Sequence, residues 1–163
     1  MKTARPHMPT TSFSMTVPGV TPEQAWQYCR NYANTTQWAP GVEVTPVEGS
    51  DSEWVVHLTS WRAFEVTCTR QEDDAPHDDN LRRVRFHMRS ASGAVRSTEE
   101  FYIGPHGEGG CFVSYVLLLG LSGWRRLPCI GAVVWVGLRS EAASTQRALE
   151  RRLLDLAKYN IDV

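Results

Sequence analysis

The sequence lacks an excess of either charge, because 17 Lys and Arg stand against 18 Asp and Glu in 163 residues. A chain this close to neutral carries no electrostatic signal for a nucleic-acid partner, and we expect none. Long apolar runs are also missing. The most apolar tract, Cys129–Leu138, has about half the length that a helix needs to span a bilayer, so we expect no membrane span.

Four cysteines are present, but they form no Cys-x-x-Cys pair and no Cys/His pattern of the kind that holds zinc, so we expect no metal site. The first residues, MKTARPHMPTTSF, lack the apolar stretch of a secretory signal, which favours a cytoplasmic protein with reduced thiols. No glycine-rich loop leads from a predicted strand into a helix. We therefore expect no nucleotide site and no cofactor.

Apolar and polar residues alternate in much of the chain, as they do in strands that are buried on one face. The first such segment is Ser12–Val17, and Thr21 then caps a short helix with Pro22 and Glu23 in its first turn. A second short helical turn is expected within NTTQWAPGV. Six further segments with short polar connections follow, which indicates antiparallel hairpins. These predicted strands are 42–49, 53–61, 63–71, 81–90, 95–104 and 111–120.

The period changes to that of a helix in residues 140–160, where Leu149, Leu153 and Leu156 share one stripe. The tract 128–138 can extend this helix upstream, with kinks near its glycines. We predict an α+β fold of the helix-grip kind: a seven-stranded curved antiparallel sheet wrapped around a long C-terminal helix, with two short helices between strands 1 and 2. The sheet and helix should enclose a hydrophobic cavity. Residues 1–11 are expected to be a flexible N-terminal tail, and 12–160 a single domain.

Three segments resemble those of a known family: SMTVPGVTPEQAW, NTTQWAPGV and GGCFVSYVLLL, followed by the Leu-rich terminal helix. Together they resemble the START-like (helix-grip, SRPBCC) superfamily and, within it, the polyketide cyclase/dehydrase family. The resemblance runs from about Ser12 to Tyr159. Two features depart from it: Cys111 stands where Thr is commoner, and GWRRLPCIGAVVWVG is bulkier than usual and could narrow or lid the cavity.

The resemblance implies a hydrophobic ligand site inside the grip. Some relatives fold and cyclise polyketide chains delivered by an acyl carrier protein, whereas others carry lipids or hormones without chemistry. The fold alone does not choose between these activities. The resemblance also marks Trp38 as a residue of the cavity mouth.

Glu99 is the first candidate for chemistry. In VRSTEEFYIG it shares a strand face with Phe101 and Ile103, whereas Glu100 shares the other face with Arg96 and Tyr102. A carboxyl group on the cavity face would lose water and become a useful general acid–base at neutral pH. A bulge that shifts the register, or an arginine partner, would instead make Glu99 purely structural.

Three further residues are candidates for the catalytic set. His57 faces the cavity if Val55 and Thr59 do, but the opposite phase of its strand buries more apolar area and is favoured. The resemblance also implies a cavity arginine that stabilises an enolate or a carbonyl oxygen, and Arg62 and Arg70 are the candidates for it. Either arginine could also pair with Glu99 as part of the structure.

Aromatic side chains suit a flat, conjugated ligand, because rings stack and the N–H and O–H groups of Trp and Tyr orient oxygen atoms. Tyr115 is expected to point inward, and Trp124 and Trp135 flank the segment that could form a lid. The candidate substrate-binding residues are Trp38, Trp61, Tyr32, Tyr115, Phe64, Phe86, Phe101, Trp124 and Trp135.

These residues predict a small-molecule cyclase of polyketide biosynthesis that closes a ring by aldol addition and dehydration, or by another cyclisation. Its partner would be a hydrophobic substrate, for which the resemblance implies delivery by an acyl carrier protein, and the protein would be a monomer or a homodimer. The alternative is a non-catalytic carrier of a lipid- or quinone-like ligand. Converging ionisable groups in the cavity would favour catalysis, and a purely apolar lining would favour transport.

Overall fold

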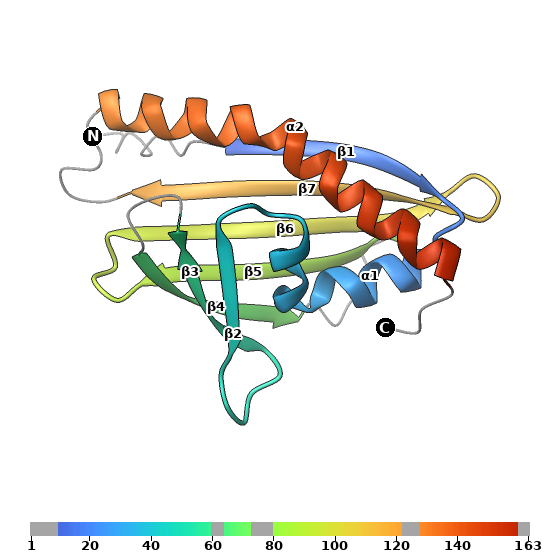
Figure 1. Ribbon diagram of the computed structural model, residues 1–163, viewed down its shortest axis with the longest axis horizontal. Coiled ribbons are helices and arrows are strands. Elements are labelled where there is room, and N and C mark those ends of the chain that lie inside the picture. Colours follow the sequence, from blue (N-terminus) through green and yellow to red (C-terminus); the bar gives the residue numbers. More distant parts are fainter. Residues whose placement is uncertain (1–9, 60–63, 73–79, 122–127, 160–163) are drawn as a thin grey trace, which may run out of the picture.

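The computed structural model describes residues 10–59, 64–72, 80–121 and 128–159, and Figure 1 shows their arrangement. One antiparallel sheet carries all the helices on a single side (Figure 1). The elements in chain order are β1 (Thr10–Pro18), α1 (Pro22–Arg30), η1 (Tyr32–Gln37), β2 (Val42–Pro46), β3 (Glu53–Leu58), β4 (Phe64–Glu72), β5 (Arg82–Ser90), β6 (Val95–His106), β7 (Gly110–Leu121) and α2 (Pro128–Tyr159).

The sheet has seven strands in the order β1-β7-β6-β5-β4-β3-β2, and every neighbouring pair is antiparallel. The first strand of the chain therefore pairs with the last, which places Phe13 opposite Tyr115. All the predicted strands are present. Strand β2 ends at Pro46, earlier than predicted, because the N–H of Ser50 donates to the carbonyl of Val47 and closes a turn.

Helix α1 begins where the sequence predicts. The hydroxyl of Thr21 accepts a hydrogen bond from the backbone N–H of Gln24, and the Gln24 side chain accepts one from the N–H of Thr21. This reciprocal pair is a capping box, which satisfies two N–H groups at the helix start. The short 3₁₀ helix η1 follows at once, and its first residue, Tyr32, is buried.

Helix α2 is continuous from Pro128, so the predicted upstream extension of the C-terminal helix is confirmed. Its two halves run in different directions in Figure 1. Leu149, Leu153 and Leu156 are buried along the stripe that the sequence predicts. Each such side chain contributes about 1.5–3 kcal/mol when it leaves water. The helix packs chiefly on β1 and reaches α1 and η1 with its C-terminal half.

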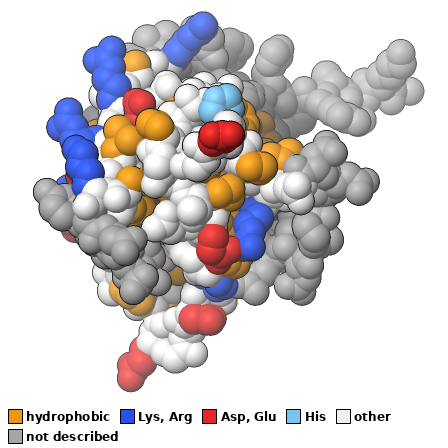
Figure 2. Space-filling model, turned by 90° about the vertical axis from the view of Figure 1, so that its right-hand side faces the viewer, with side chains coloured by type: hydrophobic (Ala, Val, Ile, Leu, Met, Phe, Trp, Pro, Cys, Tyr) orange, Lys and Arg blue, Asp and Glu red, His pale blue; other side chains and the backbone are white. Residues whose placement is uncertain are grey.

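The core lies between the helices and the inner face of the sheet. Alternate residues of the strands are buried there, for example Val84, Phe86 and Met88 on β5, while the residues between them face outward. The right-hand end of the molecule, seen in Figure 2, carries acidic and basic side chains among scattered hydrophobic ones, with several of the basic ones along its upper left edge. Among the described helices, including the 32-residue α2, none has an apolar stretch that would cross a bilayer.

Candidate functional site

Glu99 lies in the middle of β6 on the inner face of the sheet. It stands opposite Phe86 of β5 and Leu117 of β7, and its register with both strands is unbroken. Its side chain is buried, with 7% of the residue exposed, and Phe101 and Ile103 lie on the same face. The bulge that would have turned Glu99 outward is absent from this part of the described sheet. The predicted orientation of Glu99 is therefore confirmed.

Two tyrosines hold the Glu99 carboxyl group. The hydroxyl of Tyr32, at the start of η1, lies 3.1 Å from Oε1 of Glu99 and donates to it. Tyr115 of β7 forms a second hydrogen bond to the same carboxyl group. Tyr115 faces Phe101 across the β6–β7 ladder, so it reaches Glu99 diagonally, from two residues away.

Burial sets the acidity of this group. Loss of water raises the pKa of Glu99 to about 7, and the hydrogen bonds from Tyr32 and Tyr115 oppose the rise only in part. Near neutral pH the carboxyl group therefore exists in both protonation states, as a general acid–base requires. The pKa of Tyr32 and of Tyr115 lies well above that of free tyrosine, through burial and the neighbouring carboxylate, so both phenols remain hydrogen-bond donors.

Aromatic rings surround the triad formed by Glu99, Tyr32 and Tyr115. Tyr32 packs edge-on against Phe86, with ring centroids 4.8 Å apart, and Tyr115 lies 5.1 Å from Phe101. Trp54 of β3 extends the cluster, with its ring 6.0 Å from both Tyr32 and Phe86. On the inner face of the sheet, Glu99 and the two phenol hydroxyls thus lie within a closely packed and buried aromatic cluster.

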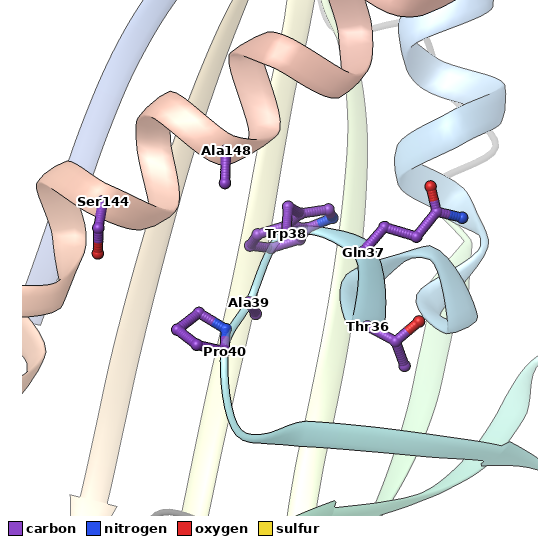
Figure 3. Close-up of a pocket in the computed structure, with 7 residues that line it drawn as sticks. All are labelled: Thr36, Gln37, Trp38, Ala39, Pro40, Ser144 and Ala148. Atoms are coloured by element: carbon purple, nitrogen blue, oxygen red, sulfur yellow. The ribbon is translucent and has the colours of Figure 1, made fainter.

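A pocket of about 320 Å³ opens beside this cluster, between α2 and the segment that joins η1 to β2. Figure 3 shows Ala148 pointing from α2 toward the indole of Trp38, whereas Thr36 and Gln37 point away from the helix. Trp38 is itself buried and packs edge-on against Phe101 and Tyr115, with both centroid distances 6.2 Å. The pocket lining consists of Thr36, Gln37, Trp38, Ala39, Pro40, Ser144 and Ala148.

Arg70 continues the inward phase of β4, as the sequence predicts, and is partly buried. Its Nη1 donates to the backbone carbonyl of Arg30, the last residue of α1, over 3.1 Å. The guanidinium also lies 5.7 Å from the ring centre of Trp54. In these contacts Arg70 fixes the end of α1 to the sheet, because a cation at a helix C-terminus satisfies its carbonyls.

His57 faces outward. Trp54 and Val56 of the same strand are buried, and His57 lies beside Glu65 of β4, with Nδ1 3.6 Å from Oε2 and 44% of its side chain exposed. This is the phase that the sequence favours, because it buries the larger apolar set. The candidacy of His57 as a cavity base is therefore wrong.

Of the remaining candidates that the sequence suggests, the structure describes the side chains of some and not of others. Phe86 and Phe101 are buried in the aromatic cluster on the inner face of the sheet, and their role as substrate-binding residues stays a prediction. Trp61, Arg62 and Trp124 lie outside the described residues, and of Phe64 and Trp135 only the backbone is described, in β4 and α2. Among the described residues, no three His, Cys, Asp or Glu side chains gather as a metal site would require.

Trp54 was not predicted as a neighbour of the site, and neither was the part of the pocket wall formed by Ser144 and Ala148. The signal for these two was present: small residues one helical turn apart, at i and i+4, leave space on a helix face that faces the sheet. Their role depends on what packs opposite them, and sequence periodicity does not identify that partner.

The model of the family described as polyketide cyclase / dehydrase and lipid transport matches residues 8–159, nearly the whole chain. No curated protein matches it in sequence.

Solved structures show the same fold. The Zhui aromatase/cyclase from Streptomyces sp. R1128 superimposes with a TM-score of 0.66 at 14% identity, over 96% of this chain and 100% of that one. A START superfamily protein from Mycobacterium smegmatis gives 0.66 at 14% identity, over 90% and 98%. The di-domain ARO/CYC BexL from the BE-7585A biosynthetic pathway gives 0.66 at 16% identity, over 92% of this chain and 47% of that one.

Proposed function

The chain belongs to the polyketide cyclase/dehydrase and lipid transport family, and on that premise we propose that it is a small-molecule cyclase of polyketide biosynthesis. The observation that carries the proposal is the buried Glu99 carboxyl group with its two phenol donors. A protein that only carries an apolar ligand has no need of a desolvated carboxyl group, which is costly to bury. The aromatase/cyclases with the same fold are consistent with this choice.

The triad suits an aldol condensation. As a carboxylate, Glu99 takes a proton from the carbon between or beside two carbonyl groups, and the resulting enolate carbon forms a bond to a second carbonyl carbon of the same chain. The protonated Glu99 then gives its proton to the new alkoxide. Removal of a second α-proton with departure of the hydroxyl group as water leaves the unsaturated ring. The net change is loss of one water molecule.

The tyrosines can act on the substrate as well as on Glu99 during these steps. A phenol that donates to the carboxyl group can instead donate to a substrate oxygen, and so stabilise the negative charge that develops there. Ring closure also gains from the folded pose of the chain, because the aromatic walls bring the two reacting carbons together. Arg62 remains a candidate for a further cation toward the substrate oxygen.

Transport of a lipid- or quinone-like ligand is the second candidate. The observation in its favour is the aromatic cluster around Glu99, which would hold an apolar ligand without any reaction. Convergence of one carboxyl and two hydroxyl groups in the middle of that cluster argues for chemistry, since transport alone is served by the apolar wall.

The test is an assay of ring closure with a hydrophobic 1,5-diketone, whose aldol condensation gives a cyclohexenone and water. We expect the wild-type protein to speed the appearance of the enone, and Glu99→Gln to lower kcat at least 100-fold, the scale of a lost acid–base group. Glu100→Gln on the outer face is the matched control and should keep its kcat. Equal turnover in Glu99→Gln would remove Glu99 from the mechanism, and binding of the diketone without turnover by the wild type would favour transport.

A further inference from the structure

The pocket between η1 and α2 and the aromatic cluster around Glu99 share one wall, the indole of Trp38. We propose that this pocket is an outer subsite for one end of a hydrophobic ligand, and that Trp38 is a movable partition between this subsite and Glu99, which the ligand displaces from its contacts with Phe101 and Tyr115. The inference rests on the proposed function for the role of Glu99, and deepens it by naming where the unreactive end of the substrate binds.

Trp38 separates the two spaces by its contacts. One side of the ring lines the pocket, and its neighbours on the other side are Phe101 and Tyr115, each at a centroid distance of 6.2 Å in edge-to-face geometry. Tyr115 in turn forms a hydrogen bond to the carboxyl group of Glu99. The path from the pocket to the carboxyl group therefore crosses the indole and then one phenol ring.

The opposite wall leaves the indole room to move. Ser144 and Ala148 are the residues that α2 places in the pocket, and both side chains are small. Figure 3 shows Ala148 directed at Trp38, and the space beside it is the pocket itself. Edge-to-face ring contacts are individually weak, so the indole can leave Phe101 and Tyr115 when a ligand takes its place.

The backbone that carries Trp38 is held at both ends, which favours rotation of the side chain over movement of the whole segment. The N–H groups of Trp38 and Ala39 both donate to the carbonyl of Thr35. Further along, the carbonyl of Gly41 accepts from the N–H of Thr59, and Gly41 has a φ of 71°, which suits glycine.

The lining defines the ligand. The indole, Ala39, Pro40 and Ala148 offer an apolar surface, while Thr36, Gln37 and Ser144 are exposed and lie at its edge. A volume of about 320 Å³ lies at the low end of small-molecule sites, enough for a single ring or a short alkyl chain. The outer subsite should therefore select substrates whose unreactive end is a short alkyl or a monocyclic aryl group.

The first test measures whether Trp38 keeps water from Glu99, with no substrate present. In protein labelled with carbon-13 at the Glu side-chain carboxyl carbon, NMR titration gives the pKa of Glu99 directly. Trp38→Ala should lower this pKa from about 7 toward 4.5, because water then reaches the carboxyl group. Trp38→Phe, which keeps a ring in place, should retain most of the raised value. Trp26→Ala is the control, since that indole stacks with Arg30 and Arg82 on α1 and β5.

The second test fills the pocket. Ala148→Leu should weaken binding of the fluorescent probe N-phenyl-1-naphthylamine at least tenfold while the Glu99 titration stays unchanged. Ala143→Leu, at an exposed position of the same helix, should bind the probe as the wild type does.

Unchanged Glu99 titration in a folded Trp38→Ala protein, or equal probe affinity in the two leucine variants, would overturn the inference. Neither measurement involves turnover, so a negative result leaves the Glu99→Gln assay, and with it the proposed function, untouched.

Discussion

The hydroxyl of Tyr32 lies 3.1 Å from Oε1 of Glu99, although 67 positions of the chain separate the two residues. The same hydroxyl lies 3.4 Å from the sulfur of Met88. A phenol has one proton to donate, and a carboxyl oxygen is a much stronger acceptor than a thioether sulfur, so the bond to Glu99 dominates. Tyr32 thus stabilises the ionised form of a carboxyl group whose burial favours the neutral form.

Removal of this donor should raise the pKa of Glu99. In Tyr32→Phe the ring stays in the aromatic cluster while the hydroxyl is lost, so the carboxylate loses part of what opposes its burial. We expect the pKa to rise above 7 in the side-chain NMR titration, and the pH optimum of ring closure to rise with it. Tyr102→Phe, which removes the donor to Glu100 on the outer face, is the control. An unchanged or lowered Glu99 pKa in Tyr32→Phe would contradict the hydrogen bond.

Glu99 should also make the stability of the protein depend on pH. Its pKa is about 7 when folded and 4.5 when unfolded, so between these values the folded state holds a proton that the unfolded state has released. The free energy of unfolding therefore falls as pH rises from 4.5 to 7, and the loss persists at higher pH. The difference in pKa corresponds to about 3 kcal/mol.

Urea unfolding of Glu99→Gln at a series of pH values measures this cost. The amide is neutral throughout, so the variant should gain about 3 kcal/mol relative to the wild type between pH 4.5 and pH 8. A constant difference between the two proteins across this range would show that Glu99 titrates normally in the folded state.

The orientation of Glu99 could be predicted because strand alternation is a local property, and β6 keeps it without a bulge. The start of α1 could be predicted for the same reason, since Thr21 and Pro22 act on their immediate neighbours. His57 shows the limit of alternation: both faces of β3 are rich in apolar residues, and burial of Trp54 and Val56 against other elements decides its phase.

The partners of Glu99 could not be predicted in this way. Tyr32 reaches it because η1 lies over β5 and β6, and Tyr115 reaches it because the register of β7 places it diagonally opposite. Both relations depend on packing between distant parts of the chain. Arg70 is similar: its inward phase follows from alternation, but its bond to the carbonyl of Arg30 depends on where α1 ends.

Arg70 should act on stability rather than on Glu99. Arg70→Met keeps much of the apolar stem but loses the hydrogen bond to Arg30 and the cation over Trp54, so we expect the free energy of unfolding to fall by about 1–2 kcal/mol. The Glu99 pKa should stay near 7, because its hydrogen bonds come from Tyr32 and Tyr115. Arg89→Met, at an exposed position of β5, is the control for loss of charge. A marked rise of the Glu99 pKa in Arg70→Met would place the guanidinium next to the carboxyl group instead.

Glu100, the next residue, should behave in the opposite way because it lies on the other face of β6. Its Oε1 accepts from Nε of Arg85 at 2.5 Å and its Oε2 from the hydroxyl of Tyr102 at 2.6 Å. Partial burial alone would raise the pKa of Glu100, but these two hydrogen bonds and the charges of Arg85 and Arg83 outweigh it, so the pKa lies below its usual value.

A lowered pKa stabilises the folded state above the unfolded value of about 4.5, and this gain is lost as pH falls through the folded pKa. At pH 7 we expect Glu100→Gln to lower the free energy of unfolding by about 1–3 kcal/mol, because it weakens two charge-assisted hydrogen bonds. The deficit should shrink as the pH falls below 4.5, whereas Glu99→Gln gains on the wild type as the pH rises. Urea unfolding of both variants over one pH series gives the two slopes together. If both variants followed the same pH dependence, the two carboxyl groups would share an environment, and the register that places them on opposite faces of β6 would be wrong.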